Sequence, residues 1–450
     1  MKIAFYSLSM LFMTLAAFRT TAQHSTLQFL RSDDIQYFRH NDKNGINTFE
    51  TTKNDSAGFS GLKVKLGGSF TQDFQGLRAS NSADPVMVNG VNTNQVTTLT
   101  NGFNLAMANL NIDVQLADGI RMNLTTYLST RHHEETWVKG GYIQFDKLPF
   151  LKSNVIDRIM DHVTIKVGDF EVDYGDQHFR RTDGGNSIYN PFVENYIMDA
   201  FATEIGGEIY YHTNNGLFAM AGISNGALNP TVIAPSKTDA ATGKVNRNYP
   251  AFHGKIGFDR QLNEDFRLRI TGSYYGIQSA SNNTLYWGDR AGSHYFMVME
   301  NTAANATDNA WSGRYNPSFS QEVNAFTINP FLKYKGLELF ATYELVRGRT
   351  ITETDTRKAT QYAADLIYRF TTGKENFWIG ARYNNVSTTL AGSLADVSID
   401  RITGSAGWFL TRNIMLKAEY VSQVYHDFPK ANIRSGGKFS GVMVEASVGF

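Results

Sequence analysis

The chain has 450 residues, 42 basic and 42 acidic side chains, and no cysteine. Zero net charge argues against nucleic acid as a partner, and the lack of cysteine excludes disulfides and thiolate metal sites. The many Tyr, Phe and Gly residues (22, 31 and 39) favour β-strands joined by tight turns over helices.

The first 23 residues have the pattern of a signal peptide. Lys2 supplies a positive charge, residues 8–18 form an apolar run, and residues 20–23 end in small side chains suited to cleavage. Residues 24–58 are polar and have no clear period, so we interpret them as a periplasmic leader or plug segment. No later stretch approaches the roughly 18 consecutive apolar residues that a membrane helix needs.

Apolar and polar side chains alternate along much of the chain after residue 58. Between 413 and 424, for example, Ile414, Leu416 and Tyr420 alternate with Lys417 and Glu419. Similar runs occupy 109–116, 266–274 and 362–370. Strands in soluble sheets average about five or six residues, whereas these runs reach about ten, which is typical of transmembrane β-barrel strands.

The pattern predicts an all-β chain, folded over 59–450 as a transmembrane antiparallel up-and-down β-barrel of about sixteen strands, with eighteen as the alternative. We expect the strands at 59–72, 102–116, 120–130, 136–146, 162–172, 201–213, 216–224, 251–261, 264–278, 323–335, 336–347, 359–371, 375–387, 397–409, 412–424 and 440–450.

The connections between these strands alternate between short and long. Short periplasmic turns and long external loops are typical of outer-membrane barrels. Residues 294–300 could form another strand, but counting them would put a long connection on the short-turn side. We therefore place them inside the fifth long loop.

The third long loop, 173–200, carries an unusual mixture of charged and aromatic side chains. Because rings need a surface to pack against, we expect this loop to fold into the barrel, with rings on the wall and charges toward a water-filled lumen. An ordinary surface loop is the alternative. If the loop 173–200 folds into the barrel, the candidate pore residues that it contributes are Asp173, Asp176, Arg180, Arg181, Asp183 and Glu194.

The facing wall is expected to be basic. Lys255, Arg267 and Arg269 lie on neighbouring predicted strands and form the densest basic patch of the inward positions. Acids on the loop opposite these bases would set a transverse field that sorts passing ions. The alternative is that these groups merely solvate the wall.

The last ten residues alternate and end in an aromatic residue, Phe450. A terminal strand ending in Phe resembles the signal by which the barrel-assembly machinery recognises bacterial outer-membrane proteins.

Together with the signal peptide, strand count and third loop, this ending resembles the Gram-negative outer-membrane porins. The segments 168–171 (GDFE) and 174–176 (YGD) are similar to segments of phosphate-selective O/P-type porins and alginate-export barrels, and 45–50 and 189–192 to Bacteroidetes outer-membrane proteins. The resemblance implies a channel in the bacterial outer membrane for small hydrophilic solutes or anions. It also implies contact with membrane lipid, no cofactor and a homotrimer.

Two other functions stay open. An outer-membrane barrel enzyme needs a nucleophile and a base at the rim, but no G-x-S-x-G motif is present and Ser224 has no evident histidine partner. A closed structural or adhesive barrel differs from a pore only in whether loops seal the lumen. Asp173, Asp176 and His178 match no complete calcium or zinc pattern, so we expect no metal.

Overall fold

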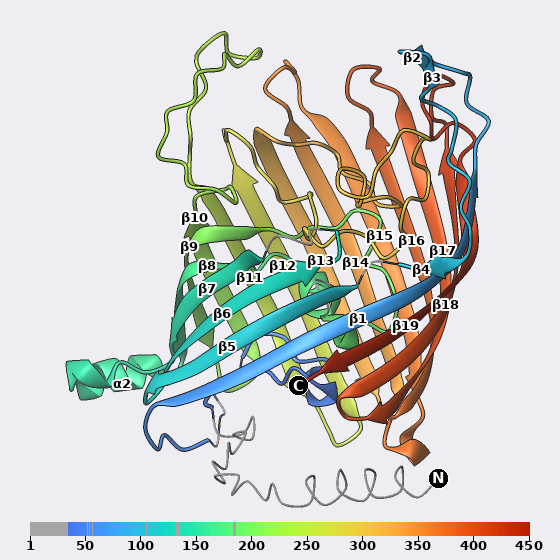
Figure 1. Cartoon of the computed structure of the whole chain (residues 1–450). Helices are drawn as coiled ribbons and strands as arrows, with labels where there is room; N and C mark the ends of the chain where they lie inside the picture. Colours follow the sequence, from blue (N-terminus) through green and yellow to red (C-terminus); the bar gives the residue numbers. More distant parts are fainter. Residues whose placement is uncertain are drawn as a thin grey trace, which may run out of the picture. The chain divides into compact units, whose positions relative to one another are not determined.

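The computed structural model describes residues 35–51, 53, 55, 57–104, 106–131, 136–182 and 186–450. Within them, sixteen long strands close into one antiparallel barrel (Figure 1). Closure occurs at β1, which pairs with both β5 and β19. The predicted signal peptide, 1–23, lies outside the described residues.

The barrel strands are β1 (Lys63–Ser80), β5 (Met107–Ala117), β6 (Ile120–Ser129), β7 (Trp137–Phe145), β8 (Val163–Glu171), β9 (Thr203–His212), β10 (Leu217–Ser224), β11 (Ala251–Gln261), β12 (Phe266–Ile277), β13 (Glu322–Tyr334), β14 (Leu337–Arg349), β15 (Arg357–Arg369), β16 (Phe377–Thr389), β17 (Asp396–Thr411), β18 (Ile414–His426) and β19 (Lys438–Gly449). The short strands β2 (Met87–Val88), β3 (Val91–Asn92) and β4 (Gly102–Phe103) lie in the first long loop. The helical segments are η2 (Lys43–Gly45), η3 (Pro149–Leu151), α2 (Asn154–Met160), η4 (Gln177–Arg180), η5 (Asn186–Tyr189) and η6 (Thr371–Gly373).

All sixteen predicted strands are confirmed, and the largest difference is in the first. β1 continues to Ser80, beyond the expected end at residue 72. Its first half pairs with β5 and its second half with β19, so the strand needs its extra length to close the barrel. Residues 294–300 lie in the fifth long loop without forming a strand, as predicted.

Short turns gather at one end of the barrel and long loops at the other (Figure 1). We call these the turn end and the loop end. The link 146–162 is the long connection at the turn end, and it contains α2. Two of the long loops contribute to the interior of the barrel: the third loop, 172–202, and the fifth loop, 278–321.

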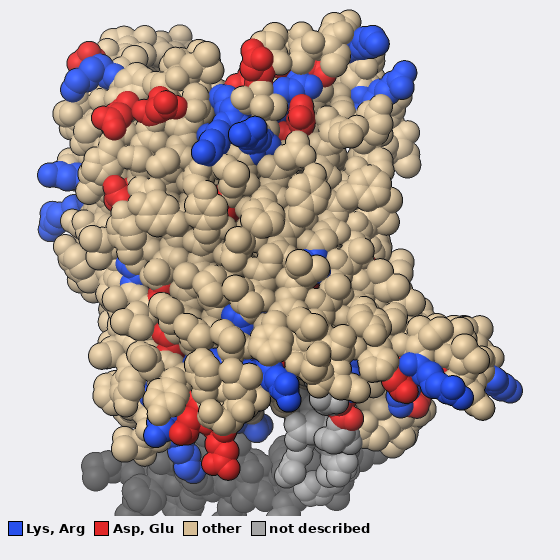
Figure 2. All heavy atoms as spheres, turned by 180° about the vertical axis from the view of Figure 1, so that it is seen from behind, with Lys and Arg blue, Asp and Glu red and all other residues tan. Residues whose placement is uncertain are grey.

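The outer surface of the barrel is apolar. Its exposed side chains include Ile205, Ile209, Ile256, Ile270, Phe326, Leu366, Ile402, Tyr420 and Val444. On the face shown in Figure 2, uncharged atoms cover most of the middle, and charged side chains gather toward the ends. Near the turn end, exposed rings of Tyr211, Tyr334, Tyr368, Phe377 and Trp408 form an aromatic girdle like those at the interfaces of transmembrane barrels. No helix in the described part of the chain is long and apolar enough to cross a membrane.

The inner surface carries the alternate, polar residues, and loops pack against it. Residues from the third loop, such as Val193 and Ile197, join Leu285 and Tyr295 of the fifth loop in the largest buried apolar cluster. Wall residues such as Val386 and Val421 complete it. The core of this barrel therefore lies inside the lumen.

Candidate functional site

The third loop is held inside the barrel by inward-facing polar side chains of the wall. Its backbone N–H groups donate to wall side chains: Asp173 to Glu208 (3.0 Å), Asp176 to Asn329 (2.9 Å), Val193 to Glu419 (2.7 Å), Ile197 to Asn384 (2.7 Å) and Met198 to Gln361 (2.9 Å). These bonds replace the water that would solvate a surface loop. The wall thus fixes the path of the loop from one side of the lumen to the other.

The aromatic rings of the third loop pack on the barrel wall, as we predicted from the sequence. Phe192 packs among Ile367 and Trp378, and the guanidinium of Arg382 lies 4.1 Å from the centre of the Phe192 ring. Arg382 in turn makes an ion pair with Asp365 at 2.7 Å. The aromatic content of this loop therefore indicated its surroundings correctly.

The four acids of the third loop that the structure describes, Asp173, Asp176, Glu194 and Asp199, do not face open water, contrary to the sequence expectation. Lys255 of β11 contacts Asp173, Asp176 (3.1 Å) and the leader residue Glu50 (3.0 Å). Arg269 of β12 contacts Asp176 and Glu50, both at 2.7 Å. These five side chains, which we call the Lys255 cluster, are almost entirely withdrawn from solvent, and their carboxylates and bases pair directly instead of facing each other across a pore.

Electrostatics in the Lys255 cluster favours the charged forms. Burial raises the pKa of Asp176, but the adjacent Arg269 and Lys255 lower it to about 2. The pKa of Asp173 is likewise lowered by Lys255 and His178, against the effect of burial. Gly175 has a φ of 73°, a left-handed conformation suited to glycine, and its carbonyl accepts a hydrogen bond from Lys255 at 2.9 Å.

The other predicted site residues have separate partners. Arg267 does not join the Lys255 cluster: it pairs with Asp259 of the neighbouring strand at 2.7 Å. Arg181 pairs with Asp199 at 2.6 Å, and Arg180 lies 3.6 Å from Glu338. Asp183, together with the glycines at 184 and 185, lies outside the described residues.

Arg314 of the fifth loop, which sequence reasoning missed, ties the two lumen loops together. It contacts Glu194 at 2.8 Å and Asp199 at 3.1 Å. Burial raises the pKa of Glu194, but Arg314 and His294 lower it to about 2. The alternating pattern carries no signal for such a contact, because it joins two irregular loops.

The leader also contacts the inside of the barrel. We use this name for the described residues between 35 and 58. Gln36 N–H donates to Gln115 at 2.8 Å, Asn47 donates to Glu338 at 2.7 Å, and Tyr189 of the third loop donates to the carbonyl of His40 at 2.6 Å. The leader therefore packs between the wall and the third loop near the turn end.

Three neighbouring cavities lie along the wall formed by β5 to β9, and the third loop, the fifth loop and the leader bound them on the inner side. Their volumes are about 60, 250 and 150 Å³. Lys139 and Thr203 line both the first and the second, whereas Arg39, Arg121, Tyr142, Lys166, His178 and Phe179 line both the second and the third. These three cavities thus follow the β5 to β9 side of the lumen, and the third of them reaches Glu50 and Asp173 at the edge of the Lys255 cluster.

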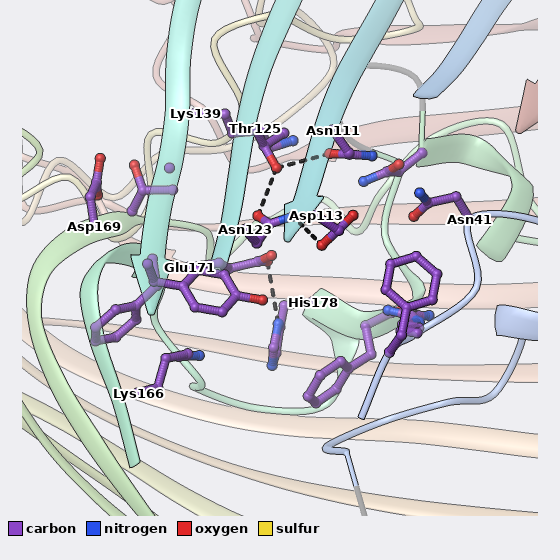
Figure 3. Close-up of a pocket in the computed structure, with 18 of the residues that line it drawn as sticks. Asn41, Asn111, Asp113, Asn123, Thr125, Lys139, Lys166, Asp169, Glu171 and His178 are labelled. Carbon is purple, nitrogen blue, oxygen red and sulfur yellow. Dashed lines mark hydrogen bonds and ion pairs between the residues drawn. The ribbon is translucent and has the colours of Figure 1, made fainter. Parts of the chain in front are cut away.

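Figure 3 shows the 250 Å³ cavity, whose lining is polar and of mixed charge. Asn123 donates to Asp113 at 2.8 Å, and Thr125 donates to Asn111 at 2.8 Å. Glu171 lies 3.3 Å from His178, and burial, which lowers the pKa of that imidazole, is outweighed by Glu171 and Asp173, which raise it. Such a surface can hydrate and orient polar solutes.

A larger cavity of about 600 Å³ opens at the turn end. Its lining combines five basic residues, Lys43, Arg267, Lys333, Lys335 and Arg369, with three acidic ones, Glu264, Asp265 and Glu375. Arg267 therefore faces a vestibule, although it lies outside the Lys255 cluster.

Comparison with known proteins gives the fold class. No protein-family model and no curated protein matches the chain. Among solved structures, an anion-selective porin from Comamonas acidovorans superposes with a TM-score of 0.50 at 9% identity, over 86% of this chain and 100% of that one. The channel DcaP of Acinetobacter baumannii superposes with a TM-score of 0.49 at 11% identity, over 88% of this chain and 100% of that one. Salmonella typhi OmpF in complex with daunomycin superposes with a TM-score of 0.46 at 11% identity, over 87% of this chain and 98% of that one.

At such low identity the likeness concerns the fold. A closed barrel with an apolar exterior and an aromatic girdle is suited to a bilayer, because all its backbone groups are paired between strands. The chain is accordingly a sixteen-stranded transmembrane β-barrel of the bacterial outer membrane, with the architecture of porins.

Proposed function

We propose that this barrel is a porin-like channel for the passive diffusion of small hydrophilic or ionic solutes. The observation that carries the proposal is the row of cavities between the wall of β5 to β9 and the segments that fill the lumen, namely the third loop, the fifth loop and the leader. They lie on one side of the lumen and reach the edge of the Lys255 cluster at Glu50 and Asp173. In this proposal the third loop acts as the constriction by filling the centre of the lumen, and solutes pass along the wall.

Charge selection in this passage depends on the wall of β6 to β8. Arg121, Lys139 and Lys166 face Asp113, Asp169 and Glu171 around the 250 Å³ cavity. Lys139 and Lys166 are paired with Asp289 (3.0 Å) and Glu208 (2.7 Å), whereas Arg121 donates to the neutral Gln144 (2.8 Å). Arg121 is therefore the base whose field is least compensated by a direct partner.

Single-channel recording in planar bilayers tests this proposal. The variant Arg121→Gln should shift the reversal potential in a salt gradient toward cation preference, because it removes a positive charge from the passage. The shift should shrink at high salt, since the Debye length falls from about 10 Å at 0.1 M to about 3 Å at 1 M. Lys244→Gln, which makes the same charge change on an exposed loop residue, is the control and should leave the potential unchanged.

Shortening the third loop tests the constriction separately. Removal of 183–190 should raise the conductance, because the narrowest section dominates the resistance of a channel. Unchanged conductance in a folded barrel contradicts the role of the loop. The resemblance to O/P-type porins and alginate-export barrels makes phosphate and a uronic acid the first anions to compare with chloride.

A closed structural barrel is the second candidate. It is favoured by the dense packing of the third loop, the fifth loop and the leader within the wall. Absence of conductance in both the full chain and the loop-shortened variant, with the barrel folded, supports this candidate over the channel.

A further inference from the structure

The link between β7 and β8 projects sideways from the barrel at the turn end (Figure 1). It begins with the turn Pro149–Leu151 and continues into the helix α2, Asn154–Met160. The Ser153 hydroxyl caps the helix by accepting from the N–H of Ile156 at 3.5 Å. This projection lies outside the barrel and takes no part in the proposed passage of solutes, so we consider its side chains separately.

The helix is amphipathic, although it has only seven residues. At about 100° per residue, Val155, Ile159, Ile156 and Met160 fall within one sector of about 140°, and Asp157 and Arg158 lie on the opposite side. Met160 is buried against the barrel rim. The apolar sector therefore includes a buried residue, Met160, and two exposed ones, Val155 and Ile159.

These two residues are exposed together with the preceding turn. Phe150, Leu151, Val155 and Ile159 expose 60%, 49%, 63% and 49% of their surfaces. Single exposed apolar residues are common on proteins, but four within ten residues form a patch. A patch of this kind indicates a contact with an apolar partner.

The position of α2 indicates which partner. The helix leads into β8, and His162, between them, donates a hydrogen bond from Nδ1 to the carbonyl of His212 at 2.8 Å. The His162 ring lies 5.8 Å from Tyr211, which belongs to the aromatic girdle, and the outward Ile209 and Val167 continue the apolar surface above it. The exposed patch is thus continuous with the lower edge of the lipid-facing belt.

We propose that Phe150, Leu151, Val155 and Ile159 form a lipid anchor that lies in the interfacial region of the leaflet at the turn end. The apolar side chains enter the boundary between headgroups and acyl chains, as in other interfacial amphipathic helices. Lys152 and Arg158 flank them and can reach lipid phosphates, whereas Asp157 faces water.

A second copy of the chain fits this patch less well. A stable protein interface buries about 1,200–2,000 Å², whereas a seven-residue helix is only about 10 Å long. Insertion into lipid needs no such minimum area, because each apolar side chain gains independently from leaving water. The bilayer is therefore the partner that a patch of four side chains can use.

A site-specific fluorophore tests the anchor, and the absence of cysteine from the chain makes single labelling simple. Ile159→Cys and Asp157→Cys are each labelled with an environment-sensitive dye and folded into phosphatidylethanolamine and phosphatidylglycerol vesicles. We expect a blue-shifted emission at position 159 that is quenched by spin-labelled lipid. The matched control at position 157, on the opposite side of the helix, should emit as in water and be quenched by iodide.

Two results overturn the anchor. If the labels at 159 and 157 respond equally to iodide and neither to spin-labelled lipid, the patch faces water. If the label at 159 is protected from both quenchers, and dilution with unlabelled protein changes its emission, the patch contacts another protein chain. A gel shift on heating, measured for each labelled protein, shows that the barrel itself is folded.

Discussion

At the scale of single residues, the closing seam of the barrel depends on a histidine. Asp73 of β1 and Glu445 of β19 are directly opposite each other, an arrangement of like charges that destabilises a sheet. His294 of the fifth loop lies between them, 2.5 Å from Asp73 and 3.3 Å from Glu445, and Lys417 lies 2.8 Å from Glu445. A protonated imidazole therefore neutralises the seam and docks the fifth loop.

This geometry predicts a loss of stability at high pH. Burial lowers the pKa of His294, but Asp73, Glu445 and Glu194 raise it to about 9, against an ordinary value of about 6.5. The contribution is complete below about pH 6.5 and is lost as the pH rises toward 9, and it amounts to about 3 kcal/mol. Urea unfolding of the wild type at pH 6 and pH 9.5 should show this loss.

The variant His294→Gln is the control for that measurement. Other groups also titrate at high pH, but only the part that disappears in His294→Gln belongs to this imidazole. An equal pH dependence of stability in the wild type and in His294→Gln rules out a stabilising role of the protonated imidazole.

Lys255 offers a second test at this scale. In this buried cluster, Lys255→Met leaves Asp176 and Glu50 with Arg269, and Asp173 with His178, as their remaining basic partners. Breaking a buried ion pair by removing one member costs about 3–5 kcal/mol, so the urea midpoint should fall accordingly. The exposed Lys244→Met should change stability by less than about 0.5 kcal/mol.

A double variant makes the assignment specific. Adding Asp173→Asn to Lys255→Met removes a carboxylate that has lost its lysine partner and should recover part of the lost stability. If the double variant is as unstable as the sum of both single variants, the two side chains are not energetically coupled.

Period-two alternation predicted the inward side of Lys255, Arg267 and Arg269, because residues two apart share a face of a strand. It could not predict their partners. Glu50 pairs with Arg269 across 219 positions of sequence, and no local pattern encodes that contact. Asp73 was missed for another reason: the expected strand ended at residue 72, and its inward position follows only once β1 is extended.

At the scale of elements, the strands were predictable and the packing of the irregular segments was not. The rings of the third loop indicated an inward fold because they need a wall. Its ion pairs with Arg314 depend on a fifth loop whose sequence has no period. Helix α2 carried a readable signal, the Ser153 cap followed by Val155 and Ile159 four residues apart, but its seven residues are too few for a strong helical period.

The leader gives a prediction at this scale. Deleting 35–51 removes Gln36, Asn47 and Glu50 from the turn end, where they contact the wall and the Lys255 cluster. If the leader is a plug, the deletion should increase single-channel conductance and widen the range of solutes that enter liposomes in swelling assays.

The matched control keeps the leader and removes one of its attachments. Asn47→Ala loses the hydrogen bond to Glu338, which keeps its ion pair with Arg369 at 2.9 Å, and should increase the single-channel conductance less than the full deletion. Equal conductance of the deletion and the full chain, with normal folding, contradicts a plug.

At the scale of the whole molecule, closure brings the two ends of the barrel sequence together. β1 pairs with β19, and beyond the last strand Phe450 exchanges backbone hydrogen bonds with Gly68, both at 3.0 Å. The ring of Phe450 is half-exposed on the outer surface and lies against Gly68, where a side chain would approach it within 3.3 Å. The final residue thus completes the seam, and trimer formation of the closed barrel remains a prediction from the porin resemblance.

The predicted role of Phe450 as an assembly signal can be separated from its role in the seam. Phe450→Asp should leave unassembled protein in the periplasm and little heat-modifiable barrel in the membrane, whereas Phe450→Tyr keeps the ring and should assemble normally. Both proteins are also refolded from urea into detergent, where no assembly machinery is present. If Phe450→Asp refolds there but fails in cells, the machinery reads the terminal ring. If it fails in both, the defect lies in the seam itself, and normal assembly of Phe450→Asp in cells refutes the signal.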